Sequence, residues 1–323
     1  MVFSIPFPYW DQLLYISSLE TAQQFLWEKY NEYDSSIAQR KSYENSYKLI
    51  YHMEQGKNFF HLSEKTPLSI QPIALFYGLS FLLKGALLVT DPNYPENVKV
   101  LAHGVSTRKR KKQDFIYLKD EIKIQKNGFF PHFSKKMFHM EQLEGKKIKI
   151  FDLMSQIPEM SPFFKKRKRI VVSYVDEKNV RIPDDVFDSF HMTPRRFFEF
   201  LGENSNKPSL FQMVENGMTF TVDRLNPPFE VLPFRFNIKD QQYYYMEDEK
   251  GLFLFRELMI HYLLLYHLSI LARYEIEWWV ELFSQKSTID YPLIYHYLRI
   301  CLVKCPLLIQ EYLFDGSNIV GKG

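Results

Sequence analysis

The chain has 323 residues, of which 46% are apolar and 24% are charged, and its net charge at neutral pH is only +3. This composition excludes an intrinsically disordered chain and provides for a large buried core. The two cysteines, Cys301 and Cys305, lie four residues apart, which is not the pattern of a disulfide-rich secreted scaffold and fits a reducing, cytosolic compartment.

The first third of the chain predicts three helices. Ser17 and Glu20 have the spacing of a capping box ahead of the first helix. A second helix is expected over residues 36–55, with Gly56 closing it as a C′ glycine. The third helix follows the sequence SI at 69–70, accommodates Pro72 in its first turn and stops at the sequence DPNYP.

The middle of the chain predicts β-structure. The segments FIYL at 115–118, EIKIQ at 121–125 and FFPHF at 129–133 have the pattern of short strands. An Asn127-Gly128 turn is expected between the last two of these segments. Further strands are expected at 147–151, at 170–175 and within 218–246, and Thr193-Pro194 predicts the start of a helix.

From residue 252 onward the pattern is helical again, with a Gly-rich tail after residue 315. This order predicts an α+β fold that is mainly helical, with a helical core built from both chain ends and a central β-rich insertion. The expected parts are an N-terminal helical part at 1–98, a basic, β-rich central part at 99–250, a C-terminal helical part at 251–315 that packs with the N-terminal part, and a flexible tail at 316–323.

Two segments, 70–89 and 252–272, are apolar enough to be considered as membrane spans. The first contains Lys84 and the second contains Arg256, Glu257, His261 and His267, and ionisable groups are costly at the centre of a bilayer. Both segments are therefore expected to be buried core helices of a protein without a membrane partner. The N-terminal sequence MVFSIPFPYWDQLL lacks a basic n-region and predicts no signal peptide.

The charge is distributed unevenly along the chain. Between Lys99 and Arg169 there are 19 Lys or Arg and seven Asp or Glu, a net charge of +12 that leaves −9 for the rest. Two five-residue runs dominate this segment and supply the candidate anion-binding residues. These are Arg108, Lys109, Arg110, Lys111 and Lys112 in the first run and Lys165, Lys166, Arg167, Lys168 and Arg169 in the second.

Three interpretations of the basic segment stay open. The cations form solvated loops, they lie on the acidic ends of the same chain or of a second copy in a homo-oligomer, or they bind an anionic partner. That partner is a nucleic acid, a nucleotide phosphate or an acidic protein surface. Nucleic-acid binding also requires stacking aromatics beside the cations. The candidates are Phe115, Tyr117, Phe129, Phe130 and Phe133.

No sequence signature of catalysis is present. The chain lacks GxxxxGK[ST], GxGxxG, HExxH and GxSxG, and no metal site or cofactor is expected. His261 and His267 are six residues apart and do not share a helix face. Arg256 and His261 match the Arg-to-His spacing of metal-independent ribonucleases of the HEPN class, which makes them low-ranking catalytic candidates.

Several motifs spread over nearly the whole chain carry a family resemblance. The sequences IQPIALFYGLSFLLKGALL, DPNYP, LAHGVSTRKRKKQDF, EIKIQKNGFF and HYLLLYHLSILARYEIEWW closely resemble the YaaC-like family of Bacillus-type bacteria. The resemblance implies a cytosolic bacterial protein whose biochemical role is unsettled. This family tends to be encoded beside IMP dehydrogenase, an enzyme of purine synthesis, which suggests that enzyme as a partner. The resemblance to this family supplies no catalytic residues.

The family pattern holds His103, Gly104 and Thr107 together with the first basic run, which favours a function for this run. His103 therefore joins the two runs as a candidate partner-binding residue. We expect a non-catalytic binding or regulatory protein whose basic central region engages an anionic partner, with IMP dehydrogenase the candidate suggested by the family. The alternatives are a nucleic-acid-binding protein and a HEPN-like ribonuclease.

Overall fold

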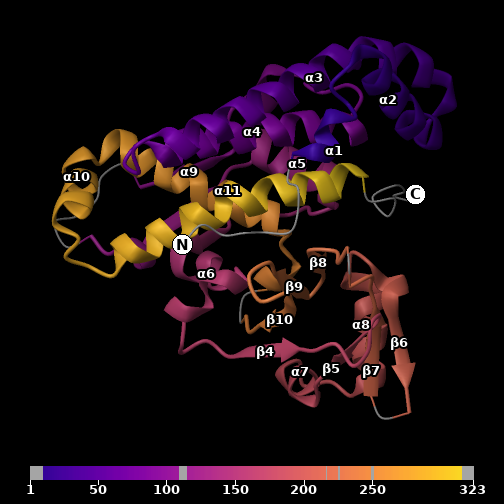
Figure 1. Cartoon of the computed structure of the whole chain (residues 1–323), viewed down its shortest axis with the longest axis vertical. Helices are drawn as coiled ribbons and strands as arrows, with labels where there is room; N and C mark the ends of the chain where they lie inside the picture. The colour runs from indigo at the N-terminus through magenta and orange to yellow at the C-terminus, as the bar shows by residue number, and fades with distance from the viewer. Residues whose placement is uncertain (1–9, 109–114, 216, 225, 249–250, 315–323) are drawn as a thin grey trace. The chain divides into compact units, whose positions relative to one another are not determined.

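The structure is a computed structural model, which describes residues 10–108, 115–215, 217–224, 226–248 and 251–314 (Figure 1). The described residues form two compact units. The helical unit comprises the described parts of Pro6–Ile150 and Leu258–Gly323, and the β-rich unit comprises Phe151–Glu257. The predicted α+β, mainly helical fold class is confirmed.

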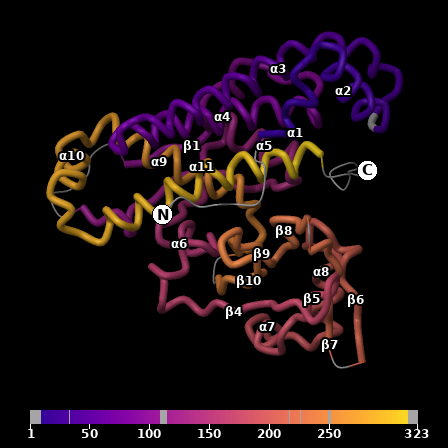
Figure 2. The backbone as a smooth tube through the Cα atoms, in the orientation of Figure 1, coloured from indigo at the N-terminus to yellow at the C-terminus, as the bar shows by residue number. Residues whose placement is uncertain are grey.

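The helices of the helical unit come from both ends of the chain (Figures 1 and 2). Helix α3 packs against α4, α2 packs on α3, and α11 packs on α4 and α3. The helical core built from both chain ends is therefore confirmed. The helices are α1 (Asp11–Leu14), α2 (Leu19–Tyr33), α3 (Ser35–Lys65), α4 (Gln71–Thr90), α9 (Glu257–Tyr274), α10 (Ile276–Gln285) and α11 (Asp290–Phe314).

Glycines set the close packing of α3 on α4. A Cβ at Gly56 would lie 2.5 Å from Leu82, and one at Gly78 would lie 2.8 Å from Phe60. The prediction that Gly56 ends its helix was wrong, because α3 continues to Lys65. Gly56 instead lets two helix backbones approach, and this interhelical contact offsets its low helix propensity.

The caps of the first helices were predicted in part. Ser18, not Ser17, is the N-cap of α2, and its hydroxyl accepts a hydrogen bond from the Thr21 amide. Pro72 lies in the first turn of α4 as expected, and α4 ends at Thr90 with Asp91 as its C-cap. By length and composition α4 and α11 could span a membrane, but 67% and 72% of their apolar windows are buried inside the structure, as in core helices.

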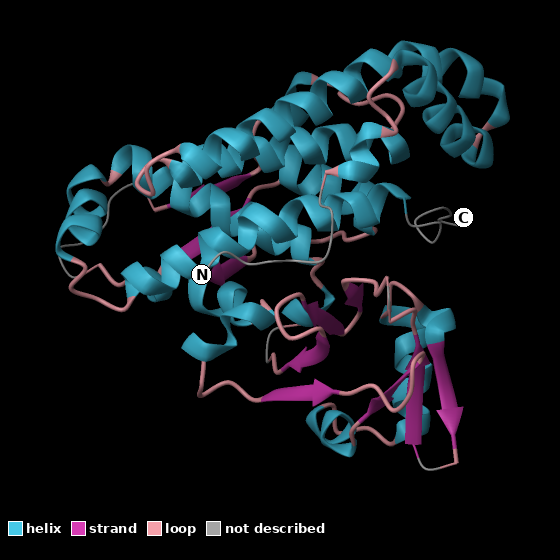
Figure 3. Ribbon diagram, in the orientation of Figure 1, coloured by secondary structure: helices cyan, strands magenta, loops and turns pink. Residues whose placement is uncertain are grey.

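A small antiparallel sheet in the order β1-β2-β3 belongs to the helical unit (Figure 3). Its strands are β1 (Val105–Thr107), β2 (Glu121–Ile124) and β3 (Lys147–Lys149), and helix α5 (Phe129–Phe138) connects the last two. Short 3-10 turns, η1 (Val98–Leu101) and η2 (Tyr117–Lys119), precede β1 and β2.

Two of the predicted strands are helical instead. FIYL leads into η2, and FFPHF begins α5, so the prediction of an Asn127-Gly128 hairpin was wrong. Phe129, Phe133 and Met137 are buried at a spacing of four, which is the period of a helix rather than of a strand. Pro131 lies in the first turn of α5, where it removes no intrahelical hydrogen bond.

The β-rich unit contains two antiparallel sheets, in the orders β4-β10-β9-β8 and β5-β7-β6. The strands predicted near 170–175 and within 218–246 are confirmed, and Thr193 caps its helix by accepting a hydrogen bond from the Arg196 amide. The elements are α6 (Ile150–Ser155), η3 (Pro158–Phe163), β4 (Arg169–Val172), β5 (Asn179–Ile182), α7 (Asp184–Ser189), α8 (Pro194–Asn204), η4 (Pro208–Leu210), β6 (Phe211–Val214), β7 (Gly217–Thr221), β8 (Glu230–Val231), β9 (Phe234–Asn237), β10 (Gln242–Met246) and η5 (Leu252–Leu254).

Candidate functional site: a cationic sheet face and a buried His–Cys cluster

One face of the β1-β2-β3 sheet carries lysines. In β2 and β3 the isoleucines Ile122 and Ile148 are buried opposite each other, and the alternation of the strand exposes their neighbours. Lys123 then lies directly opposite Lys147, and both side chains are exposed. Like charges at directly opposed positions destabilise a sheet, so the fold itself does not favour this pair.

Two further cations extend this face. Lys149 lies opposite Glu121 across the same strand pair, and Arg108 follows the last residue of β1. The Arg108 guanidinium is 3.8 Å from the Glu121 carboxylate, which makes Glu121 the acid within this group. Within the described part of the chain, Lys123, Lys147 and Lys149 form no ion pair. We call Arg108, Lys123, Lys147 and Lys149 the cationic face.

The first basic run begins on this face. Arg108 is its described residue, and Lys109, Arg110, Lys111 and Lys112 lie outside the described residues. A role for these four side chains therefore stays a prediction. Lys123, Lys147 and Lys149 were not among the predicted site residues, although their alternation with isoleucines in the sequences EIKI and KIK could have placed them on the exposed side of a sheet.

His103 and Gly104 are held by packing contacts. The His103 ring lies against Phe76 and Tyr266, with ring centroids 5.1 and 5.5 Å apart, and its carbonyl accepts a hydrogen bond from Tyr262. Burial lowers the pKa of His103, and the charges of Arg273 and Lys84 lower it further, which favours the neutral ring. His103 is thus suited to packing, and its predicted role in partner binding stays a prediction.

Gly104 contacts Gly128 backbone to backbone. A Cβ on Gly128 would collide with the Gly104 Cα and N atoms, and both glycines have positive φ angles, +77° and +128°. The Phe130 amide, two residues after Gly128, donates to the His103 carbonyl at 3.1 Å. The HG and NGFF motifs therefore form one interlocked backbone structure at the start of α5.

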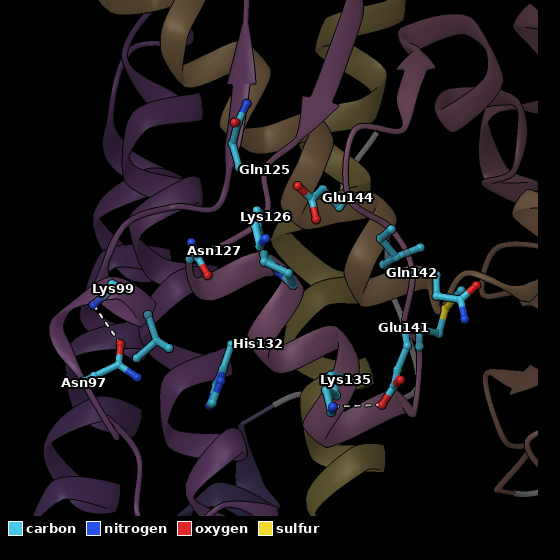
Figure 4. Close-up of a pocket in the computed structure, with 15 residues that line it drawn as sticks. Asn97, Lys99, Gln125, Lys126, Asn127, His132, Lys135, Glu141, Gln142 and Glu144 are labelled. Atoms are coloured by element: carbon cyan, nitrogen blue, oxygen red, sulfur yellow. Dashed lines mark hydrogen bonds and ion pairs between the residues drawn. The ribbon is translucent and has the colours of Figure 1, made fainter.

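A cleft of about 600 Å³ lies where β2 ends and α5 begins (Figure 4). Its lining carries both charge signs: Lys99, Lys126 and Lys135 against Glu141 and Glu144. Lys135 already pairs with Glu141 at 2.9 Å. This mixture differs from the cationic face and gives the cleft no strong preference for anions.

The second basic run belongs to the β-rich unit, and both of its arginines contact buried groups there. Arg167 forms a 2.8 Å ion pair with the buried Asp152 and stacks on the Phe151 ring. Arg169 donates to the Ser161 hydroxyl and lies over the Tyr244 ring. Its lysines Lys165, Lys166 and Lys168 are exposed. Their predicted role in binding stays a prediction.

Four of the five aromatic residues considered for base stacking are core residues, and Phe115 is partly buried. Tyr117 is fully buried, as are Phe130 and Phe133, and Phe129 is 2% exposed. Phe115 packs edge-on against Trp278, with ring centroids 4.9 Å apart. Base stacking requires an exposed ring face, so the four buried residues add nothing to a nucleic-acid interface.

Arg256 and His261 each have a structural partner. In the β-rich unit, Glu230 accepts from Arg256 at 2.8 Å and from the Glu257 amide at 2.6 Å, and it lies 3.9 Å from the fully buried Arg235. In the helical unit His261 has no exposed surface. A general base must reach a substrate, so the geometry gives no support to the ribonuclease hypothesis.

His261 belongs to a buried cluster that sequence reasoning missed. Its Nδ1 atom lies 3.6 Å from the Cys301 sulfur and 3.2 Å from the Tyr297 hydroxyl. The ligand atoms of His261, Cys301 and Cys305 all lie within 4.8 Å of one another, and none of the three residues has exposed surface. The spacing of the cysteines indicated a shared helix face, but nothing local indicated a histidine 40 residues away.

The cluster favours a thiolate. Burial raises the pKa of Cys301, but the hydrogen bond from Cys305 and the charge of His261 outweigh burial and lower that pKa to about 6. Burial and the two neighbouring sulfurs raise the pKa of Tyr297, which keeps its hydroxyl protonated and able to donate. Cys301 and Cys305 are both free cysteines in the structure.

Comparison with known proteins places the chain in a family. Searches of curated proteins and of solved structures found no match. The model of the family described as YaaC-like protein matches residues 14–313, nearly the whole chain, in agreement with the resemblance of its motifs. The protein therefore belongs to the YaaC-like family.

Proposed function

We propose that this protein is a non-catalytic binding or regulatory protein of the cytosol, and that its basic central region docks on an acidic surface of a partner protein. The observation that carries the proposal is the pair Lys123 and Lys147, directly opposed and exposed on a sheet face where Glu121 is the acid. Such a pair destabilises the free protein, and an anionic partner relieves the repulsion.

A protein surface suits this face better than a nucleic acid does. Single-stranded nucleic acids require exposed aromatic rings between the cations, and the candidate rings are buried or packed. IMP dehydrogenase is the candidate partner suggested by the family resemblance. Nucleic-acid binding is the competing function, and the same experiment separates the two.

The test is a pull-down of the full chain from cytosol, with and without nuclease, read by mass spectrometry. The informative variant is Lys123→Gln/Lys147→Gln/Lys149→Gln, which removes three charges and keeps part of each aliphatic stem. Its matched control is Lys65→Gln/Lys178→Gln/Lys239→Gln, which removes the same charge at three exposed positions elsewhere.

We expect one nuclease-resistant protein whose recovery falls by about tenfold or more with the first triple variant, and is unchanged with the control. Equal recovery with both triple variants would remove the cationic face from the proposal. Recovery of RNA or DNA, lost on nuclease treatment, would favour the nucleic-acid alternative, whose affinity falls steeply with salt. Purified IMP dehydrogenase mixed with each variant tests the named candidate directly.

A further inference from the structure

Three potential metal ligands converge inside the helical unit, apart from the cationic face. His261 comes from α9, and Cys301 and Cys305 come from successive turns of α11. Residues four apart on a helix share a face, so both sulfurs point toward the same side of α11. We propose that His261, Cys301 and Cys305 bind one Zn²⁺ ion that clamps α9 to α11.

The distances agree with zinc coordination. Zinc binds thiolate sulfur at about 2.3 Å and imidazole nitrogen at about 2.0–2.1 Å, so two such ligands at the tetrahedral angle lie about 3.6 Å apart. The His261 Nδ1 atom and the Cys301 sulfur are 3.6 Å apart. The three ligand atoms all lie within 4.8 Å of one another, so small rotamer adjustments bring them around one ion.

The charges of the three ligand side chains also fit a buried zinc ion. An isolated ion is very costly to bury, and all three residues lack exposed surface. Two thiolates and a neutral imidazole around Zn²⁺ form a group with no net charge, which removes most of that cost. Sulfur and imidazole ligands select zinc over magnesium and calcium, which prefer oxygen.

Tyr297 completes the surroundings of the ion. Its hydroxyl lies 3.2 Å from the His261 Nδ1 atom, and it hydrogen-bonds to Cys301. It is therefore placed to support a ligand sulfur or to occupy the fourth position. Because the cluster is buried, no substrate reaches the ion, and its role is structural rather than catalytic. A nucleophilic Cys–His pair would need access that these residues lack.

The zinc content and the cobalt spectrum of the full-length protein test the proposal. The protein is produced in zinc-supplemented medium, or in cobalt-supplemented medium to load the buried site during folding, and is freed of any histidine tag. We expect one equivalent of zinc per chain, and an intense thiolate-to-cobalt charge-transfer band in the cobalt form. The chain has only two cysteines, so such a band assigns the metal to this cluster without any variant.

Variants then test each ligand. Cys301→Ala, Cys305→Ala and His261→Asn are expected to lose most of the bound zinc, and the two Cys variants to weaken the charge-transfer band. Leu302→Ala, which removes a buried apolar side chain from the same helix, is the control and retains the metal. A folded wild-type protein with neither zinc nor a thiolate–cobalt band overturns the proposal, even where a variant fails to fold.

Discussion

The two basic runs each contain two arginines and three lysines, but Arg108, the described residue of the first run, has different surroundings from the arginines of the second. In the second run, Arg167 and Arg169 contact the buried Asp152 and Ser161 and two aromatic rings. On the cationic face, Arg108 has a long contact to Glu121, and Lys123 and Lys147 face each other with no ion pair in the described part of the chain. A run of cations therefore does not define one role: arginines that stack and pair stabilise a fold, and exposed lysines that repel are available to a partner.

The largest expected effect on stability is at Arg167. Replacing it with Ala removes an ion pair to a buried carboxylate and a cation–π contact, and we expect the free energy of unfolding to fall by about 2–3 kcal/mol. Urea denaturation measures this. Lys166→Ala, at the exposed neighbouring position, is the control and should leave the midpoint unchanged. Equal midpoints for both variants would contradict the structural role of this run.

An intermediate effect is expected at Asp91, whose carboxylate contacts His132 and Lys136 of α5. Burial raises the pKa of Asp91, but the hydrogen bond from His132 and the charge of Lys136 outweigh burial and lower it. A carboxyl whose pKa is lowered on folding stabilises the protein above its unfolded pKa of about 3.9, and this contribution is lost as the pH falls through the folded pKa.

Asp91→Asn should therefore lower the free energy of unfolding at pH 7 by about 1–2 kcal/mol. It should also make stability less dependent on pH in the acid range. Urea denaturation between pH 7 and pH 3 checks both outcomes. An acid dependence as steep as that of the wild type would show that the Asp91 pair does not contribute to it. Lys136→Gln, at a partly exposed position, should have a smaller effect.

The smallest change in the free energy of unfolding is expected for single lysine variants of the cationic face. Lys147→Gln removes the repulsion with Lys123 and should raise the free energy of unfolding by a few tenths of a kcal/mol. Lys149→Gln, two residues further along β3, removes an attraction to Glu121 and should not raise the free energy of unfolding. Thermal denaturation compares the two, and the difference should shrink in high salt because screening weakens both interactions. Identical shifts at low salt would contradict the repulsion.

Much of the helical part was predictable because its signals are local. Pro72, Asp91 and Thr193 act within one turn of the helix end that each one marks. Gly56 was misread because its role depends on Leu82, which lies on another helix. FFPHF was misread because aromatic residues favour strands, although Phe129, Phe133 and Met137 repeat with the period of a helix.

The candidate site was predicted less completely. Arg108 was found from composition, but the cationic face needed the register of β2 on β3, which pairs Lys123 with Lys147. The buried cluster needed the packing of α9 against α11, because His261 and Cys301 are 40 residues apart. Such tertiary contacts have no local sequence signal.

The contact of Gly104 with Gly128 bears on how related sequences are to be read. Neither position accepts even a methyl group, since each would push it into the other backbone or into Pro131, and both φ angles are positive. A larger residue at one site cannot be compensated at its partner, which already has no side chain to remove. Across homologues these glycines should thus be invariant whatever the protein binds. Invariant glycines at these two positions would follow from steric packing alone. Evidence of selection for a partner would have to come from the variable positions around them.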